Sequence, residues 1–324
     1  MSCSPGIRRI CPSSRPTGFD LTLDLLVAGE INPDLILSGD VLPRFGQAEQ
    51  LLDSASLTIG SSAAIFACGA ARLGLRPALI GVCGDDMFGR FMLDQLAARG
   101  VAVGNAIIRH GQPTGLSVIL NRAADRAILT LPGLIGALRG SEISDALLEQ
   151  ARHLHVASYF LQTDLRPDLP DVFQRARRLG LTTSLDTNYD PSEQWAHLDA
   201  LLPRTDILFL NEREALALSG ESDLEAAVTR LAPQVKTLAV KLGSQGAIGK
   251  RDGLLSRVPA IPVRVVDTVG AGDSFDAGFI YAFLNHWDLE RSLRLACACG
   301  ALSAQQAGGT AGQPTLTEAM QHVS

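Results

Sequence analysis

The sequence lacks the features that define several large classes of protein. Its longest apolar stretches are only as long as a strand, so we expect no transmembrane helix. Its formal net charge is −6 and its basic residues are scattered, which gives no support for nucleic-acid binding. The six cysteines include no Cys-x-x-Cys pair, a pattern that favours free thiols in a reducing cytoplasm over disulfides or zinc. A Walker A phosphate loop is excluded as well, because no Gly-x-x-x-x-Gly-Lys-Ser/Thr string occurs.

The length of the chain bounds its domain organisation. With 324 residues it can form one large α/β domain with an appendage, or two domains. Residues 1–24 have no apolar core of the kind found in signal peptides, and we expect them to form a flexible leader. The folded part is then expected over residues 25–324.

One glycine-rich stretch carries most of the chemical information. Residues 267–279 read DTVGAGDSFDAGF, after an apolar β-branched run at 263–266 and before helical spacing of apolar residues over 275–284. This order predicts a strand, a tight turn and the start of a helix. Gly270 and Gly272 permit positive φ, and successive N–H groups of such a turn, with those of the helix N-terminus, form a nest for an anion.

Asp273 follows this turn directly and would repel an anion that is merely bound there. A carboxylate at this position makes sense if it takes a proton from a hydroxyl that attacks a phosphoryl group held in the nest. The plain alternative is a glycine turn in which Asp273 caps the helix.

The full string resembles the C-terminal signature of the PfkB/ribokinase family of carbohydrate and nucleoside kinases, D-T-x-G-A-G-D-x-F-x-A-G, at every fixed position. The resemblance implies ATP-dependent transfer to a sugar-like alcohol, with Mg²⁺ bridging the nucleotide phosphates. It implies Asp273 as the base. The N–H groups of Gly270, Ala271 and Gly272 would stabilise charge on the transferred phosphoryl group. The similarity runs from about residue 25 to residue 316.

The first expected strand, residues 25–31, runs into a turn that contains Asn32 and Asp34. Such a turn lies at the carboxyl edge of a sheet, where open α/β sheets bind ligands. The family has a G-x-x-x-x-D turn whose Asp accepts hydrogen bonds from substrate hydroxyls, and Asp34 matches it. A solvated turn aspartate is the alternative.

The family's N-terminal signature is met only in part. Gly60 and Ser61 stand for its two glycines, and Ile65 replaces an Asn that commonly contacts the sugar. This departure leaves the substrate open. A nucleoside is the rival substrate, since Ile65 and Phe66 would supply an apolar slot beside Asp34.

Two β-rich inserts, about residues 35–59 and 101–131, are hard to fit into a doubly wound sheet. We expect them to form one small lid sheet. Members of the family cover the substrate with such a lid and many dimerise through it, so the resemblance implies a homodimer. Lid closure would exclude water. Arg126 is expected to be a solvated hairpin residue, with a contact to a polar substrate group as the alternative.

The nucleotide side is indicated by two further family motifs. Asn211 and Glu214 match N-x-x-E, in which the Asn lies near the phosphates and the Glu orders water around Mg²⁺; a helix-capping arrangement fits equally well. Gly243 and Gly246 match the nucleotide-binding turn L-G-x-x-G-A. Lys241 before it would pair with phosphate or be an ordinary strand-end lysine.

Three more assignments come from the resemblance alone. Thr268 would belong to the ATP site, and Cys297 falls where the family often has an adenine-side residue. Asp267, with the glycine turn at residues 308–310, would line a potassium site.

Other polar residues carry less weight. Asp186 and Asn188 fit the family's D-x-N-x-R, but Asp190 replaces the usual Arg. His153 and His155 lie on one side of an expected strand with no further ligand nearby, so we expect core or edge histidines.

Together these patterns predict an α/β, ribokinase-like fold: a mostly parallel sheet flanked by helices on both faces, with a small β lid. The expected ligands are a sugar-like substrate, ATP and Mg²⁺, with K⁺ as a further candidate. Outside the enzyme class, the alternative is a sugar-binding regulatory relative without catalysis, against which the intact Gly-Ala-Gly-Asp argues.

Overall fold

The computed structural model describes residues 22–122 and 125–323. Most of the expected leader therefore lies outside the described residues. The described chain is already part of the fold at Asp24, a buried residue whose carboxylate accepts hydrogen bonds from Arg76 and Arg152. The expected boundary after residue 24 stays a prediction for residues 1–21.

A central eight-stranded sheet has the order β14-β13-β12-β11-β10-β9-β1-β4. The strands from β12 to β4 pair in parallel, and β13 and β14 complete one edge antiparallel. Its strands are β1 Leu25–Ala28, β4 Pro77–Ile80, β9 His153–Val156, β10 Thr182–Asp186, β11 Ile207–Asn211, β12 Thr237–Lys241, β13 Ala247–Arg251 and β14 Leu254–Val258.

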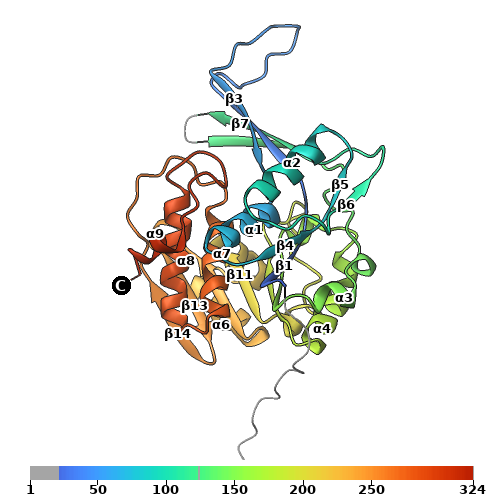
Figure 1. Ribbon diagram of the computed structural model, residues 1–324. Helices are drawn as coiled ribbons and strands as arrows, with labels where there is room; N and C mark the ends of the chain where they lie inside the picture. Colours follow the sequence, from blue (N-terminus) through green and yellow to red (C-terminus); the bar gives the residue numbers. More distant parts are fainter. Residues whose placement is uncertain (1–21, 123–124, 324) are drawn as a thin grey trace, which may run out of the picture.

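Helices cover both faces of this sheet (Figure 1). Side chains alternate along each strand, so Leu25 and Val27 of β1 join one hydrophobic cluster, while Leu26 and Ala28 join the other. The first cluster contains side chains of α1 Ser62–Arg72, α2 Met87–Ala98, α7 Ala271–Leu284, α8 Leu289–Ser303 and α9 Leu316–Met320. The second contains side chains of α3 Asp145–Leu148, α4 Leu169–Arg178, α5 Glu212–Ser219 and α6 Leu224–Leu231.

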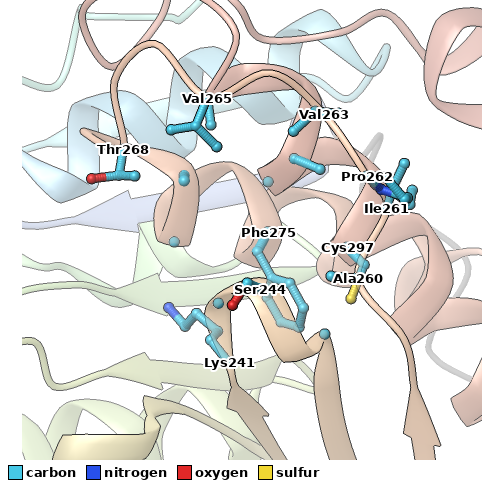
Figure 2. A pocket seen from close by; sticks show the side chains of 17 residues that line it. Lys241, Ser244, Ala260, Ile261, Pro262, Val263, Val265, Thr268, Phe275 and Cys297 are labelled. Carbon is cyan, nitrogen blue, oxygen red and sulfur yellow. The ribbon is translucent and has the colours of Figure 1, made fainter.

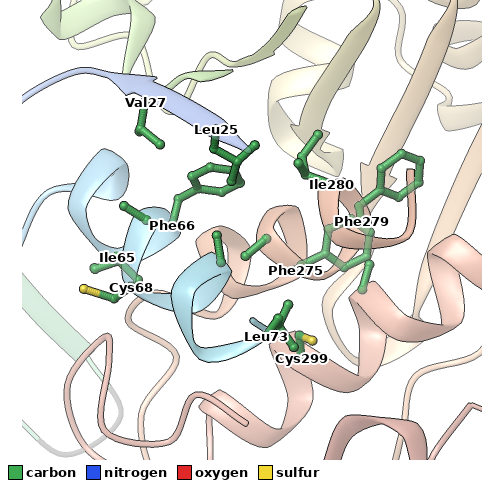
Figure 3. Packing of buried hydrophobic residues seen from close by; sticks show 14 of the residues in the cluster. Leu25, Val27, Ile65, Phe66, Cys68, Leu73, Phe275, Phe279, Ile280 and Cys299 are labelled. Carbon is green, nitrogen blue, oxygen red and sulfur yellow. The ribbon is translucent and has the colours of Figure 1, made fainter. Parts of the chain in front are cut away.

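The packing of α1 against α7 joins the two halves of the expected site (Figure 3). Phe66 of α1 and Phe275 and Phe279 of α7 are buried in the same cluster. Gln313 ties the two helices together, because its Nε2 donates to the Ile65 carbonyl at 2.8 Å and to Ser274 Oγ at 3.2 Å. The helix that follows the N-terminal motif, α1, and the helix of the C-terminal signature, α7, thus pack together as one unit.

A second, four-stranded sheet has the order β3-β2-β7-β8 and confirms the small sheet predicted from the two inserts. Strands β2 and β7 pair in parallel and the other pairs are antiparallel. The loop that joins β2 to β3 extends away from the rest of the molecule (Figure 1). The strands are β2 Pro33–Ser38, β3 Ser54–Ile59, β7 Leu116–Arg122 and β8 Asp125–Leu131.

Three local predictions were wrong. Asp34 lies in strand β2 and not in a turn, because the small sheet begins at Pro33. Of the strands expected in the second insert, β6 Ile107–Arg109 pairs with β5 Val82–Gly84 outside the small sheet. Residues 263–266 form no strand. This run passes the end of α8, where the Val266 N–H donates to the Ala304 carbonyl at 2.8 Å, and Val266 is 58% exposed.

The histidines and cysteines behave as predicted. His153 and His155 are buried in β9, and both contact Ser184 Oγ at 2.7 Å. His155 also stacks on Phe66 with ring centroids 3.8 Å apart. The four cysteines in the described part of the chain are free thiols. In the same residues, no helix is both long enough and apolar enough to cross a membrane.

Candidate active site

Polar side chains gather where the parallel strands of the central sheet end. Lys241 is the last residue of β12, Asn211 of β11 and Asp186 of β10, and Glu30 follows β1 closely. Asn211 and Lys241 are direct partners in the ladder. This carboxyl edge also meets the N-termini of α1, α5 and α7, which begin at residues 62, 212 and 271. Unpaired N–H groups and strand-end side chains are therefore concentrated in one region.

A cavity of about 530 Å³ lies beside the start of α7 (Figure 2). One wall is apolar and includes Ile261 and Pro262, together with Val263 of the run that was expected to be a strand. The other walls come from the turn after β12 and from α7 and α8. The predicted nucleotide residues that line the cavity are Lys241, Gly243, Gly246, Thr268 and Cys297, together with Ala271 and Gly272 of the signature.

Of the two glycines in the turn, Gly270 has the positive φ that the sequence suggested, whereas Gly272 lies within α7 and does not. Gly270 precedes α7 with φ +71°, in the left-handed region, and the side on which a Cβ would stand faces the turn at Gly309. A Cβ there would lie 2.7 Å from the Gly309 backbone, so only glycine fits. The Ala271 N–H donates to the Thr268 carbonyl at 3.3 Å, which engages one of the three expected anion donors within the turn itself.

Asp273 is buried in the first turn of α7. Burial raises the pKa of this carboxyl to about 8, and the nearby Asp186 and Glu30 carboxylates add to the rise, against the Lys241 ammonium. Its side chain hydrogen-bonds with Ser62 at the start of α1. Asp273 therefore stands between the cavity on the α7 side and the polar residues on the α1 side, and an uncharged form is accessible near neutral pH.

Lys241 does not stand free at the end of its strand. Its Nζ lies 2.7 Å from Asp186 Oδ2 and 2.9 Å from Asp276 Oδ2. Asp186, Asp273 and Asp276 each place a carboxylate oxygen within 4.8 Å of the other two. Burial would lower the pKa of Lys241, but the adjacent Asp186, Asp276 and Glu214 carboxylates raise it above its ordinary value, so this lysine stays charged.

Asp276 was missed in the sequence because it occupies a variable position of the signature. Burial raises the pKa of its carboxyl well above the ordinary value. One of its oxygens, Oδ1, is buried without a hydrogen-bond partner among the described residues. Asp186 was noted only as part of a motif. Its ion pair with Lys241 joins residues 55 positions apart, which no local pattern reveals.

On the substrate side, Asp34 projects from β2 next to Gly60. A Cβ on Gly60 would lie 2.2 Å from Asp34 Oδ1, so the glycine makes room for the carboxylate. The pKa of Asp34 is raised to about 7, mainly by burial and then by the charge of Glu30, with Arg126 opposing the rise. Asn32, also predicted here, has its Oδ1 buried without a partner in the described chain.

The hydroxyl of Ser61 is already engaged in the structure. It donates to the Glu30 carbonyl at 2.6 Å and accepts from the Ala64 N–H at 3.0 Å, which makes Ser61 the N-cap of α1. Asn211 and Glu214 likewise form a capping box at the start of α5, and Asn211 is not among the described residues that line the cavity. Burial raises the pKa of Glu214 to about 7, and the charge of Asp186 adds to the rise.

Glu30 is a site residue that the sequence analysis missed. Its carboxylate accepts from the Ser62 N–H at 2.8 Å, from Ser158 Oγ at 2.9 Å and from Gln162 Nε2 at 2.9 Å. Asn188 completes this network by donating to Ser62 Oγ at 2.6 Å. The sequence carried only a weak signal for it, because the strand was expected to run to residue 31, whereas β1 ends at Ala28 and Glu30 stands just beyond this strand end, where ligands bind.

Other expected residues lie elsewhere. Phe66 is fully buried against His155, and Ile65 packs on the Gly270 and Gly309 turns, so these two side chains form no open slot beside Asp34. Asp190 accepts hydrogen bonds from residues 192, 194 and 195 and shapes its own loop.

Asp267 ties two loops together. Its carboxylate accepts from the Val269 N–H at 3.0 Å and from the Gly308 N–H at 2.9 Å. The loop before the glycine turn is thereby fixed to the turn at residues 308–310, which also packs against Gly270.

Known proteins share this architecture and these motifs. The model of the pfkB family of carbohydrate kinases matches residues 22–316. An ATP-dependent ribose-1-phosphate kinase of Halopiger xanaduensis is 34% identical over 288 residues, which cover 88% of this chain and 93% of the relative. A ribokinase of Haemophilus influenzae is 26% identical, with 92% and 97% of the two chains covered.

Among solved structures, a ribokinase II candidate from E. coli in complex with ATP and Mg²⁺ superimposes with a TM-score of 0.82. It is 26% identical, and the match covers 93% of this chain and 99% of that one. The chain thus belongs to the pfkB family of carbohydrate kinases and is an ATP-dependent sugar kinase.

Proposed function

We propose that this enzyme transfers the terminal phosphoryl group of ATP to a hydroxyl of a sugar or sugar-like small molecule, with Asp273 as the general base. The observation that carries the proposal is the position of the buried Asp273, next to the cavity residue Gly272 and within interaction distance of Ser62 and Glu30. The hydroxyl proton would move to the Asp273 carboxylate while the hydroxyl oxygen bonds to phosphorus and ADP leaves.

The cavity suits ATP on two counts. Its apolar wall at residues 260–263 would take the adenine, with Cys297 nearby, and the glycine turns at 243–246 and 270–272 would let backbone approach the phosphates. Bound Mg²⁺ would neutralise phosphate charge during transfer. Glu214 fits a role in ordering its water shell, since this buried carboxylate lies near the charges of Asp186 and Lys241.

On the acceptor side, Asp34 would accept hydrogen bonds from substrate hydroxyls, and Asn32 offers a buried acceptor that lacks a partner in the described chain. Ribose 1-phosphate, the substrate named for the Halopiger relative, is one acceptor to test. Arg126 on β8 would then meet its phosphate, since this residue is close enough to Asp34 to lower the pKa of that carboxyl. For the nucleoside alternative, Phe66 would not form the apolar slot, because it belongs to the core.

The test is ADP release from Mg·ATP with a panel of acceptors: ribose, ribose 1-phosphate, fructose, keto-acid sugars and adenosine. We expect turnover with one sugar class, and a loss of about 100-fold or more in Asp273→Asn, the scale of general-base catalysis. Nucleotide affinity, measured by calorimetry, should stay within a few-fold. Turnover that survives in Asp273→Asn would refute the assigned base, and ATP binding without any turnover would favour the non-catalytic alternative.

Running the panel with and without K⁺ tests the potassium site. The ion would bind to backbone carbonyls of the loops that Asp267 holds together, with this carboxylate supplying the negative charge. We expect K⁺ to raise turnover over Na⁺ at equal ionic strength. Identical rates in both salts would remove the ion from the proposal.

A homodimer through the small sheet is part of the same proposal. Strand β8 exposes Ile128, Leu129 and Leu131 to more than half of their full extent, at 54%, 59% and 52%. Leu129 and Leu131 are two residues apart and so lie on the same face of β8, and an exposed apolar patch is typical of an interface. Light scattering should give twice the mass of the chain, and Leu129→Asp should give the monomer mass.

The free buried thiols of the described residues suit a reducing cytoplasm, which is the proposed location of the enzyme.

A further inference from the structure

Asp276 has no role in the chemistry proposed above, yet it is one of two carboxylates that hold Lys241. The side chains of Asp186 and Asp276 are 2% and 1% exposed and that of Lys241 is 14% exposed. Lys241 also lines the nucleotide cavity. The exposed part of a buried ion cluster thus points into the space where a triphosphate would lie.

The ammonium group is located beside the glycine turn. A Cβ built on Gly272 would lie 3.3 Å from Lys241 Nζ, so the charge sits against the backbone of the expected anion nest. Asp273 is the next residue along the chain. A phosphoryl group that passes from nucleotide to acceptor would move through the space between Lys241 and Asp273.

A lysine side chain has four rotatable bonds and needs partners to stay in one place. Asp186 from β10 and Asp276 from α7 grip Nζ from two different elements. The other charged groups that face this cluster are Glu214 from α5, Asp273 from α7 and Glu30 after β1. All of these are acidic, so the cluster holds one cation among several carboxylates.

This inference rests on the proposed phosphoryl transfer. We propose that Asp276 is a positioning residue, which together with Asp186 fixes the Lys241 ammonium beside Gly272. There the ammonium stabilises negative charge on the phosphoryl group during its transfer. Asp276 does not touch the substrates and acts through Lys241. A preorganised cation at this point stabilises the transition state without moving during the reaction.

The sharpest test is a double-mutant cycle of Asp276→Asn and Lys241→Met. Asp276→Asn keeps the shape of the side chain and should lower kcat about 10- to 100-fold, the scale of a misplaced catalytic group. The affinity for Mg·AMP-PNP should stay equal or become tighter, because a negative charge near the phosphates is removed. Lys241→Met should lower kcat about 100-fold or more.

The double variant should be no slower than Lys241→Met alone, since Asp276 has nothing left to position. A merely structural role for Asp276 predicts a different result, namely that kcat, nucleotide affinity and melting temperature fall together. If Asp276→Asn has the same effect with and without Lys241, or no effect on kcat, the proposal is overturned. Should Lys241→Met fail to fold, Lys241→Gln, which can still donate to both carboxylates, replaces it in the cycle.

A matched control comes from the opposite edge of the sheet. Lys236 pairs with the buried Asp206 at 2.6 Å. Lys236→Met breaks this lysine–aspartate pair at the end of β12 opposite to Lys241. Its kcat should stay within about two-fold of the wild type, the usual result for an independent surface site.

Nucleotide binding separates failure of this inference from failure of the proposed function. If the wild type binds Mg·AMP-PNP but phosphorylates no acceptor, the function fails. In that case the inference is tested by binding alone. The preference for AMP-PNP over ADP should disappear in Lys241→Met and should persist or grow in Asp276→Asn. A preference unchanged in Lys241→Met overturns the inference.

Discussion

Asp24, at the amino edge of the central sheet, and Asp34 and Asp273, in the candidate active site, differ in how the fold treats a buried carboxylate. At the amino edge, Asp24 precedes β1 and accepts hydrogen bonds from Arg76 and Arg152. Burial would raise the pKa of Asp24, but the hydrogen bonds and charge of Arg76 lower it below the ordinary value. In the candidate site, burial is the main cause that raises the pKa of Asp34, on the small sheet, to about 7 and that of Asp273, at the start of α7, to about 8.

The difference shows which carboxylates find a positively charged partner within the fold itself. Asp24 is paired by arginines of the same chain, so its ionised form stabilises the native state. Asp34 and Asp273 are surrounded by further carboxylates, and their ionised forms are unfavourable until a ligand donates hydrogen bonds or a cation. Aspartates of the first kind belong to stability and those of the second kind to function.

The largest expected effect that tests this contrast is on acceptor affinity. Asp34→Asn should raise the KM for the sugar about 10- to 100-fold, because a hydrogen bond to a charged group contributes about 1.5–3 kcal/mol. The Mg·ATP KM should change little. Initial-rate kinetics give both values, and Asp24→Asn is the matched control with both KM values within two-fold of the wild type. An unchanged sugar KM in Asp34→Asn would remove Asp34 from the site.

The second effect is on stability at the amino edge. Asp24→Asn should lower the free energy of unfolding by about 1.5–3 kcal/mol, since the hydrogen bonds from Arg76 and Arg152 lose their charged acceptor. The pKa of Asp24 is lowered in the folded state, so its contribution is present above a pH of about 4 and is lost as the pH falls further. Urea titrations at several pH values measure this, and equal stability of both proteins at pH 7 would contradict it.

The third effect has the opposite sign. Asp273→Asn should raise the melting temperature by a few degrees at alkaline pH, because the variant no longer buries an ionisable carboxyl. With a folded-state pKa of about 8, above its unfolded value, Asp273 makes the wild type lose stability as the pH rises toward 8. Thermal scans across this pH range should show the two proteins diverging. A variant less stable than the wild type at every pH would contradict the contrast between Asp24 and Asp273.

The smallest effect is a shift of the pH profile. We expect kcat/KM to rise with pH through an apparent pKa of about 8, as Asp273 loses its proton. Glu30→Gln removes a nearby negative charge that raises the pKa of Asp273, so this limb should move to lower pH by a fraction of a unit. In Asp24→Asn the limb should stay in place. A shift to higher pH in Glu30→Gln would show that the Glu30 charge does not act on the base.

The parts of the site that local patterns encode were predictable from the sequence. The signature around Asp273 and the positive φ of Gly270 follow from a strand-length run, two glycines and a helical period, although the run at 263–266 is not a strand. Its β-branched residues fit a strand equally well, but the run lies against α8 and the cavity and has no ladder partner. A loop segment beside a pocket can have the same composition as a strand in a sheet.

What the sequence could not predict depends on long-range pairing. Lys241 was ambiguous between a phosphate ligand and a strand-end lysine, and its two carboxylate partners come from α7 and from β10. Glu30 required knowledge that α1 places the Ser62 N–H beside the end of β1. Phe66 was a candidate for the apolar slot of the rival nucleoside substrate. The sequence predicts its helix but not the rotation of that helix, which puts the ring against His155.

Asp34 stands on the small sheet, whereas Asp273, Lys241 and the nucleotide cavity belong to the large one. In evolutionary terms, the roles proposed above would place the choice of acceptor and the transfer of the phosphoryl group on different sheets. After a gene duplication, substitutions in β2, β7 and β8 would change the substrate specificity of the enzyme, while the residues proposed for phosphoryl transfer are inherited unaltered. A descendant with a new substrate would then need its substitutions mainly in the small sheet.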